Sequence, residues 1–119
     1  MKKILFSLAV LGLAVLFTSA DTQLFKTALR VTVLDDSGNV MEGATVRLFA
    51  SEKDYKEEKN AIKPDEASTD DKGVIWFRDI EAKEYWVLAE KGDKNNWESG
   101  IKTEPLLQKK VNRINIIIE

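Results

Sequence analysis

Apolar and polar residues alternate along short stretches of this chain, with turn-forming residues between the stretches. Leu29, Val31 and Val33 alternate with polar neighbours, which is the period-two pattern of a strand with one buried face. A similar alternation follows after a Gly-Ala step. The pattern predicts strands over residues 27–34 and 44–51.

A highly charged stretch, residues 52–65, interrupts the alternation. It is rich in helix-favouring Glu and Lys, ends near Pro64, and follows Ser51, a residue type that caps helix N-termini. Its best apolar anchors are Tyr55 and Ile62. We expect a surface insertion that forms a turn or a short helix.

Turn residues separate the remaining predicted strands. Asp, Ser, Gly and Asn fill residues 35–39, and a similar Asp- and Gly-containing turn occupies 69–73. Asp and Asn side chains bond to nearby backbone, and Gly readily adopts positive φ. The strands expected after the insertion are 66–70, 74–80, 84–90, 101–104 and 111–119. Seven short strands with turns between them predict an all-β sandwich.

The turns and core positions together form longer motifs. The first begins at Asp35 and reads D-x-x-G-x-x-x-x-G-A-x-V-x-L. The second begins at Thr69 and reads T-D-x-x-G-x-x-x-F-x-x-I, and the third begins at Tyr85 and reads Y-x-V-x-A. This order resembles the carboxypeptidase regulatory-like domains of the prealbumin-like (transthyretin-like) superfamily, which includes the collagen-adhesin B-type repeats. The resemblance implies a seven-stranded Greek-key β-sandwich. It covers residues 29–90 well and the tail weakly, and Lys83-Glu84 replaces the usual Pro-Gly.

The resemblance also implies how two aromatic strands are connected. The link between 74–80 and 84–90 would cross from one sheet to the other, which places Trp76 and Trp86 on opposite outer faces. A plain hairpin would instead set these two side chains side by side. The residues expected to point inward are Ile75, Phe77, Ile80, Tyr85, Val87 and Ala89.

The first twenty residues have the pattern of an export signal. Lys2 and Lys3 precede an apolar run over 4–17, and small residues lead to Ala20. The run is shorter than the roughly 20 apolar residues of a membrane-spanning helix. We expect cleavage after Ala20, a leader over 21–26, and a single domain over 27–119 with no membrane span. The chain has no Cys, so a lipoprotein is excluded and a periplasmic or secreted protein is expected.

Composition limits the chemistry. Without Lys2 and Lys3 the chain carries 16 Lys and Arg against 20 Asp and Glu, so no nucleic-acid partner is expected. The absence of His and Cys excludes His-based triads, Cys–His pairs and His or Cys metal sites. The acidic turn at 35–39 lacks the full calcium-loop pattern. We predict no catalytic residues, no metal site and no cofactor.

Exposed aromatic side chains are the main candidates for binding. Residues on the outer faces of the sandwich would either contact a partner or lie under the insertion or the leader. A polar loop with two amides and an indole is a candidate sugar site. The candidate binding residues are Phe49, Trp76, Trp86, Leu88, Asn95, Asn96 and Trp97.

Two activities known among relatives fit the sequence poorly. Some adhesin repeats form a Lys–Asn isopeptide bond beside an acid; Glu90 and Asn115 would fit, but Lys26 is out of register with the inward face of its strand. Enzymatic relatives that hydrolyse a urate derivative depend on His, which this chain lacks.

The sequence therefore predicts a non-catalytic exported module of the bacterial cell envelope that acts through protein–protein contact. The alternative is a carbohydrate-binding module that uses an exposed Trp, and a hydrolase is a remote alternative. The expected partner is an envelope protein or a glycan. Exposed strand edges also permit weak self-association.

Overall fold

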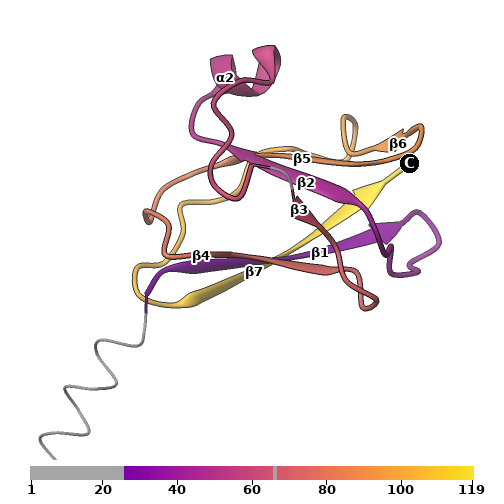
Figure 1. Ribbon diagram of the computed structural model, residues 1–119, viewed down its shortest axis with the longest axis horizontal. Coiled ribbons are helices and arrows are strands. Elements are labelled where there is room, and N and C mark those ends of the chain that lie inside the picture. Colours follow the sequence, from indigo (N-terminus) through magenta and orange to yellow (C-terminus); the bar gives the residue numbers. More distant parts are fainter. Residues whose placement is uncertain (1–25, 66) are drawn as a thin grey trace, which may run out of the picture.

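The computed structural model describes residues 26–65 and 67–119. Two sheets pack face to face, so the all-β sandwich is confirmed (Figure 1). The first sheet has the order β4 (Val74–Arg78), β1 (Ala28–Asp35) and β7 (Val111–Ile118). The second sheet has the order β3 (Ala67–Ser68), β2 (Thr45–Phe49), β5 (Trp86–Lys91) and β6 (Lys94–Asn95).

The core lies between the sheets and contains the predicted inward residues, with Leu106 in addition. Leu29, Val31 and Val33 of β1 are fully buried there. Each such side chain contributes about 1.5–3 kcal/mol through burial. From the two aromatic strands, all six predicted residues belong to this core or pack against it.

The connection between β4 and β5 crosses from one sheet to the other. β4 pairs with β1, whereas β5 pairs with β2 and β6. The crossing predicted from the family resemblance is therefore confirmed. Trp76 and Trp86 belong to different sheets, and their partners in the register are Arg30 and Phe49.

The first and last strands are parallel neighbours. The register runs from Ala28 opposite Val111 to Asp35 opposite Ile118. Ile114, Ile116 and Ile118 face the same side as the inward residues of β1. Among the described strands, β7 stands at the end of its sheet and pairs with β1 along one edge. On the other edge, Glu119, just after β7, exchanges backbone hydrogen bonds with Asn95.

Asp35 organises the first turn as its residue type predicts. Its Oδ1 accepts hydrogen bonds from the backbone N–H groups of Ser37 and Asn39, both at 2.9 Å. A short side chain thus closes the turn locally.

Thr69 joins its own turn to the segment that precedes β2. Its Oγ1 accepts from the Ala44 N–H at 2.9 Å and donates to the Met41 carbonyl. Four residues later, Gly73 has φ of +74°, and a Cβ there would lie 2.9 Å from the Val33 carbonyl oxygen. Only glycine fits this position without a shift of the backbone.

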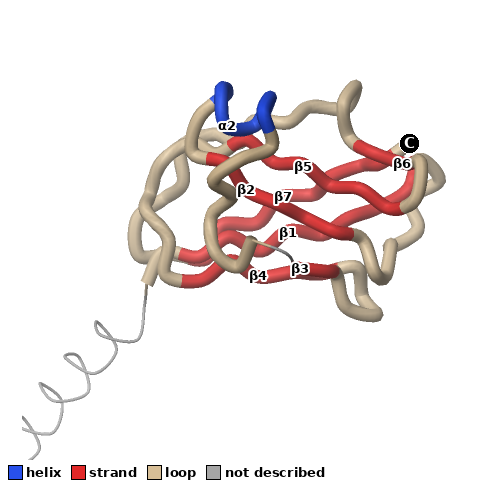
Figure 2. The backbone as a smooth tube through the Cα atoms, turned by 45° about the horizontal axis from the view of Figure 1, so that its top comes forward, coloured by secondary structure: helices blue, strands red, loops and turns tan. Residues whose placement is uncertain are grey.

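The insertion forms helix α2 (Glu52–Glu57), which lies outside the second sheet (Figure 2). Ser51 is its N-cap, because the side chain accepts from the Asp54 N–H. Tyr55 is buried beneath the helix. The predicted short helix and the role of Tyr55 as an anchor are both confirmed.

The prediction of a strand over 101–104 was wrong. Lys102 forms a single bridge to Trp86, and the short strand β6 lies instead within residues 91–100, the polar loop that was considered as a sugar site. The outer edge of β5 is thus paired in two pieces, and a side chain fills the space between them, as described below.

The predicted signal segment 1–20 and leader residues 21–25 lie outside the described part of the chain. Within the part described, no helix is long and apolar enough to cross a membrane.

Candidate functional site

Phe49 and Leu88 do not form an exposed binding surface. Both are buried together with Tyr55 under helix α2, with Ala61 and Trp86 packed against them. The Tyr55 ring meets the Phe49 ring edge-on, with centroids 5.9 Å apart. The alternative that the insertion covers this face is confirmed, because Tyr55 of the helix packs on Phe49 and Leu88.

Trp86 and Trp97 lie at the margin of this covered cluster. Trp86 is half-buried, with the Lys102 Nζ 5.3 Å from its ring centroid. Trp97 is 50% exposed, although its ring lies 5.2 Å from that of Tyr55. Trp97 is therefore partly held by the helix and partly open to solvent.

Asn96 has a structural role. The side chain is fully buried. Its Oδ1 accepts from the Ala89 N–H at 3.1 Å, and its Nδ2 donates to the carbonyls of Val87 at 2.9 Å and Gly100 at 3.1 Å. The amide thus bonds to β5 where neither β6 nor Lys102 does. The prediction that Asn96 contributes to an exposed site was wrong.

Asn95 and Trp97 remain from the predicted sugar site. They line a hollow of about 460 Å³ with Glu98 and Glu119. The Asn95 backbone pairs with Glu119 in both directions, so this hollow lies where the chain end meets β6. Sugar binding here stays a prediction.

Trp76 lies on the outer face of the first sheet and is half-buried. The guanidinium carbon of Arg78 is 4.3 Å from its ring centroid, which is close enough for a cation–π contact.

The three groups considered for an isopeptide bond do not meet. Lys26 Nζ lies 3.4 Å from Asp79, and Glu90 pairs with Arg47 at 2.9 Å. Asn115 is exposed. In the part of the chain that the structure describes, no group of three or more Asp and Glu residues is arranged to hold a metal ion.

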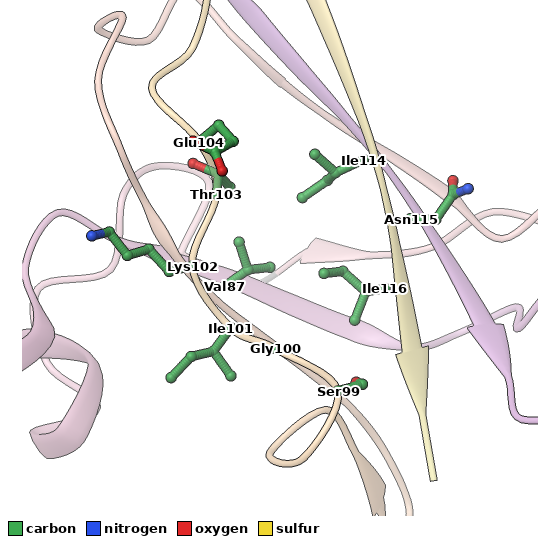
Figure 3. A pocket seen from close by; sticks show the side chains of 10 residues that line it. All are labelled: Val87, Ser99, Gly100, Ile101, Lys102, Thr103, Glu104, Ile114, Asn115 and Ile116. Atoms are coloured by element: carbon green, nitrogen blue, oxygen red, sulfur yellow. The ribbon is translucent and has the colours of Figure 1, made fainter.

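A cleft opens between β7 and the segment 99–104, on the side of the sandwich where both sheets end (Figure 3). Its volume is about 280 Å³. The side chains of Ile114 and Ile116 point into it from β7, while Asn115 points away (Figure 3). The lining residues are Val87, Ser99, Gly100, Ile101, Lys102, Thr103, Glu104, Ile114, Asn115 and Ile116.

The segment 99–104 is bound to the second sheet. The Thr103 N–H donates to the Tyr85 carbonyl at 2.8 Å, and Thr103 Oγ1 accepts from the Tyr85 N–H at 3.0 Å. A bond from Ser99 Oγ to the Ile117 carbonyl, at 2.6 Å, joins the segment to β7 near one end. The cleft is therefore narrowed at that end and open along the middle of β7.

Alternate residues of β7 direct their backbone N–H and C=O groups to opposite edges of the strand. The Ala28 N–H donates to the Lys110 carbonyl, so in this parallel ladder the even-numbered residues of β7 bond to β1. The odd-numbered residues direct N–H and C=O groups to the free edge, as the Ser99 bond to Ile117 illustrates. Arg113 and Asn115 thus offer donors and acceptors to an added strand.

This site was not found by sequence reasoning. The alternation in 111–119 identified the inward residues, but it could not show which edge of the strand stays unpaired. That depends on the parallel pairing with β1, far away in the sequence.

No family model matches the chain, and no curated protein matches it. Among solved structures, a streptococcal ancillary pilin is similar with a TM-score of 0.61 and 13% identity, over 80% of this chain and 32% of that one. The group B streptococcus pilus 2b backbone protein has a TM-score of 0.57 and 13% identity, over 78% and 40%. BcpA, the major pilin subunit of Bacillus cereus, has a TM-score of 0.50 and 21% identity, over 79% and 30%.

At these identities the likeness shows a shared β-sandwich fold. The chain spans less than half the length of each of these neighbours, so it corresponds to one part of them.

Proposed function

We propose that this chain is a non-catalytic exported module that acts in the bacterial cell envelope by binding a protein partner. The observation that carries the proposal is that, among the described residues, one edge of β7 is without a strand neighbour and lies beside a cleft into which Ile114 and Ile116 point (Figure 3). The partner would supply an extended segment that adds to this edge as a further strand. Such β-strand addition gains affinity from backbone bonds and specificity from side-chain pockets.

The proposed location and fold family rest on separate features. Lys2, Lys3 and the apolar run that ends near Ala20 support export through a cleaved signal over residues 1–20. The motif order from Asp35 to Tyr85 supports a prealbumin-like domain of the carboxypeptidase regulatory-like type. Similar folds in proteins named as pilin subunits support a structural role outside the cytoplasm.

The geometry of the edge makes a peptide the natural occupant. Free N–H and C=O groups that repeat at every second residue are matched by the backbone of another extended chain. Ile114 and Ile116 lie beside that edge, so an apolar side chain of the added strand would enter the cleft. Burying that side chain would contribute about 1.5–3 kcal/mol to binding.

A proline on the free edge tests the proposal. A phage-displayed library of linear peptides is selected on the purified protein, and the affinity of each selected peptide is measured for the parent and for Asn115→Pro. We expect the substitution to abolish binding, because it removes the Asn115 N–H that faces the edge. The β1–β7 ladder should persist, since proline is tolerated on the unpaired side of edge strands.

Asn115→Ala is the matched control and should keep the affinity, because it alters only the outward side chain. Hydrogen exchange gives a second readout: the amides of Arg113 and Asn115 should become protected when a peptide binds. Selected peptides that bind Asn115→Pro as tightly as the parent would contradict the proposal.

A further inference from the structure

An aromatic and basic row crosses the outer face of the first sheet. Trp76, Arg30 and Arg113 are direct partners on β4, β1 and β7. Because neighbouring strands lie about 4.8 Å apart, these side chains stand next to one another. Arg78, opposite Ala28 in the register, covers the Trp76 ring from the same face.

The arginines of this row are not neutralised by close ion pairs. The chain has four arginines, and among the described residues only Arg47 lies within 4.0 Å of a carboxylate oxygen. Arg30 helps to lower the pKa of Asp70, but that carboxylate already accepts two backbone hydrogen bonds within its own turn.

The pairing of Arg30 with Arg113 lowers the stability of the sheet. Like charges directly opposite each other on adjacent strands destabilise a sheet. The sequence is acidic overall, so a row of unpaired arginines is not a consequence of composition. An arrangement of this kind suits an anionic partner, since arginine binds carboxylates through two parallel hydrogen bonds.

The basic row ends at the free edge where the proposed strand would add. Arg113 belongs to β7, and its backbone faces that edge, while its side chain lies on the outer face. In an added strand, alternate side chains point to opposite faces of the sheet. Those on one face would enter the cleft beside Ile114 and Ile116, and those on the other would extend the row beyond Arg113.

We infer that the strand bound at β7 alternates apolar and acidic residues, with the apolar ones in the cleft and the acidic ones beside Arg113 and Arg30. The inference rests on the proposed function and specifies its partner. The complementary charge distinguishes this occupant from an uncharged or basic extended segment. It also explains why the face keeps two neighbouring arginines.

An acidic polypeptide is favoured over an acidic glycan. A sugar would stack on the open face of an aromatic ring, whereas Arg78 already covers the Trp76 ring at 4.3 Å. The adjacent unpaired edge, in contrast, requires the regularly spaced backbone groups of a peptide.

The test uses three labelled peptides in which Val alternates with Glu, Gln or Lys. Their affinities for the protein are measured by fluorescence anisotropy. We expect the Glu peptide to bind about fivefold more tightly than the Gln peptide, as an exposed ion pair allows, and the Lys peptide to bind most weakly. Arg113→Gln should reduce the affinity for the Glu peptide to that for the Gln peptide.

Lys56→Gln is the matched control, since it removes the same charge from an exposed position on helix α2 and should leave all three affinities unchanged. Asn115→Pro should abolish binding of every peptide. Equal affinities for the three peptides, still lost on Asn115→Pro, would overturn the inference and leave strand addition standing.

Two other results would also overturn the inference. Failure of all three peptides to bind would remove strand addition along with it. The second is that polygalacturonate binds, that Arg113→Gln abolishes this binding, and that the Glu peptide does not bind. That result would assign the row to a glycan.

Discussion

Short polar side chains act as backbone substitutes at several places in this sandwich. Asn96 bonds to both Ala89 and Val87 where the edge of β5 has no strand beside it. Thr69 ties its own turn to the Gly-Ala step before β2. These side chains satisfy backbone groups that would otherwise be buried without partners, which costs about 1–3 kcal/mol each.

Asp70 makes stability depend on pH. Its Oδ1 accepts from the N–H groups of Val74 at 3.0 Å and Lys72 at 2.9 Å, and these bonds lower its pKa from the ordinary value of an aspartate. A carboxyl whose pKa is lower in the folded state stabilises the fold above its unfolded pKa. That contribution is lost as the pH falls through the folded pKa.

We therefore expect Asp70→Asn to reduce the loss of stability between about pH 5 and about pH 2. The change in unfolding free energy between the two pH values is measured by urea unfolding, followed by tryptophan fluorescence. The matched control is Asp71→Asn, which removes one carboxylate from the exposed neighbour. An equal loss of unfolding free energy in the parent and Asp70→Asn would show that these hydrogen bonds do not couple folding to pH.

Helix α2 is stabilised by its contact with the sheet. With six residues it is too short to be stable alone, and Tyr55 provides its buried contact with Phe49. The Tyr55 hydroxyl is buried and has no hydrogen-bond partner among the residues that the structure describes. Burial, with Glu58 and Glu90 nearby, raises its pKa. The ring therefore stabilises this face, whereas the hydroxyl opposes burial.

Two substitutions at Tyr55 separate these contributions. Tyr55→Phe should keep or raise the free energy of unfolding, by up to about 1–3 kcal/mol, because an unsatisfied buried group is removed. Tyr55→Ala should lower it by about 3–5 kcal/mol, as for other large aromatic deletions. Urea denaturation measures both. A marked loss of stability in Tyr55→Phe would mean that the hydroxyl has a partner.

Short, locally determined elements were predicted better than those that depend on distant pairing. Ser51 and the charged run were sufficient to predict α2, because capping and helix propensity act within a few residues. Residues 101–104, by contrast, were predicted as a strand that ends at Pro105. Their pairing with β5 is limited to a single bridge, at Lys102, because Asn96 occupies the neighbouring part of that edge.

We expect non-covalent contacts alone to hold the described sandwich together. Lys26, Glu90 and Asn115 are far from the arrangement that an isopeptide bond requires, since two of them pair elsewhere. We expect electrospray mass measurement of the protein, produced from the full sequence in a bacterial host, to give the mass of residues 21–119. A deficit of one ammonia would reveal the cross-link, and the mass of the full chain would contradict cleavage after Ala20.

The alternation of residues and the turn chemistry determined much of this protein. Period-two patterns identified the inward residues of the main strands, and Asp35, Thr69 and Gly73 marked the turns. These signals act over a few residues, so they can be recognised without knowledge of the partner strand. The sandwich class and most of its core followed from them.

Only the tertiary structure decided which surfaces stay open. Phe49 and Leu88 have the alternation of exposed residues, yet helix α2 covers them. β7 carries a pattern of isoleucines that does not indicate whether one edge or both are paired. Its parallel pairing with β1 uses one edge, and no other described strand pairs with the second. Hydrogen bonding and cover depend on contacts between residues far apart along the chain, which no local pattern specifies.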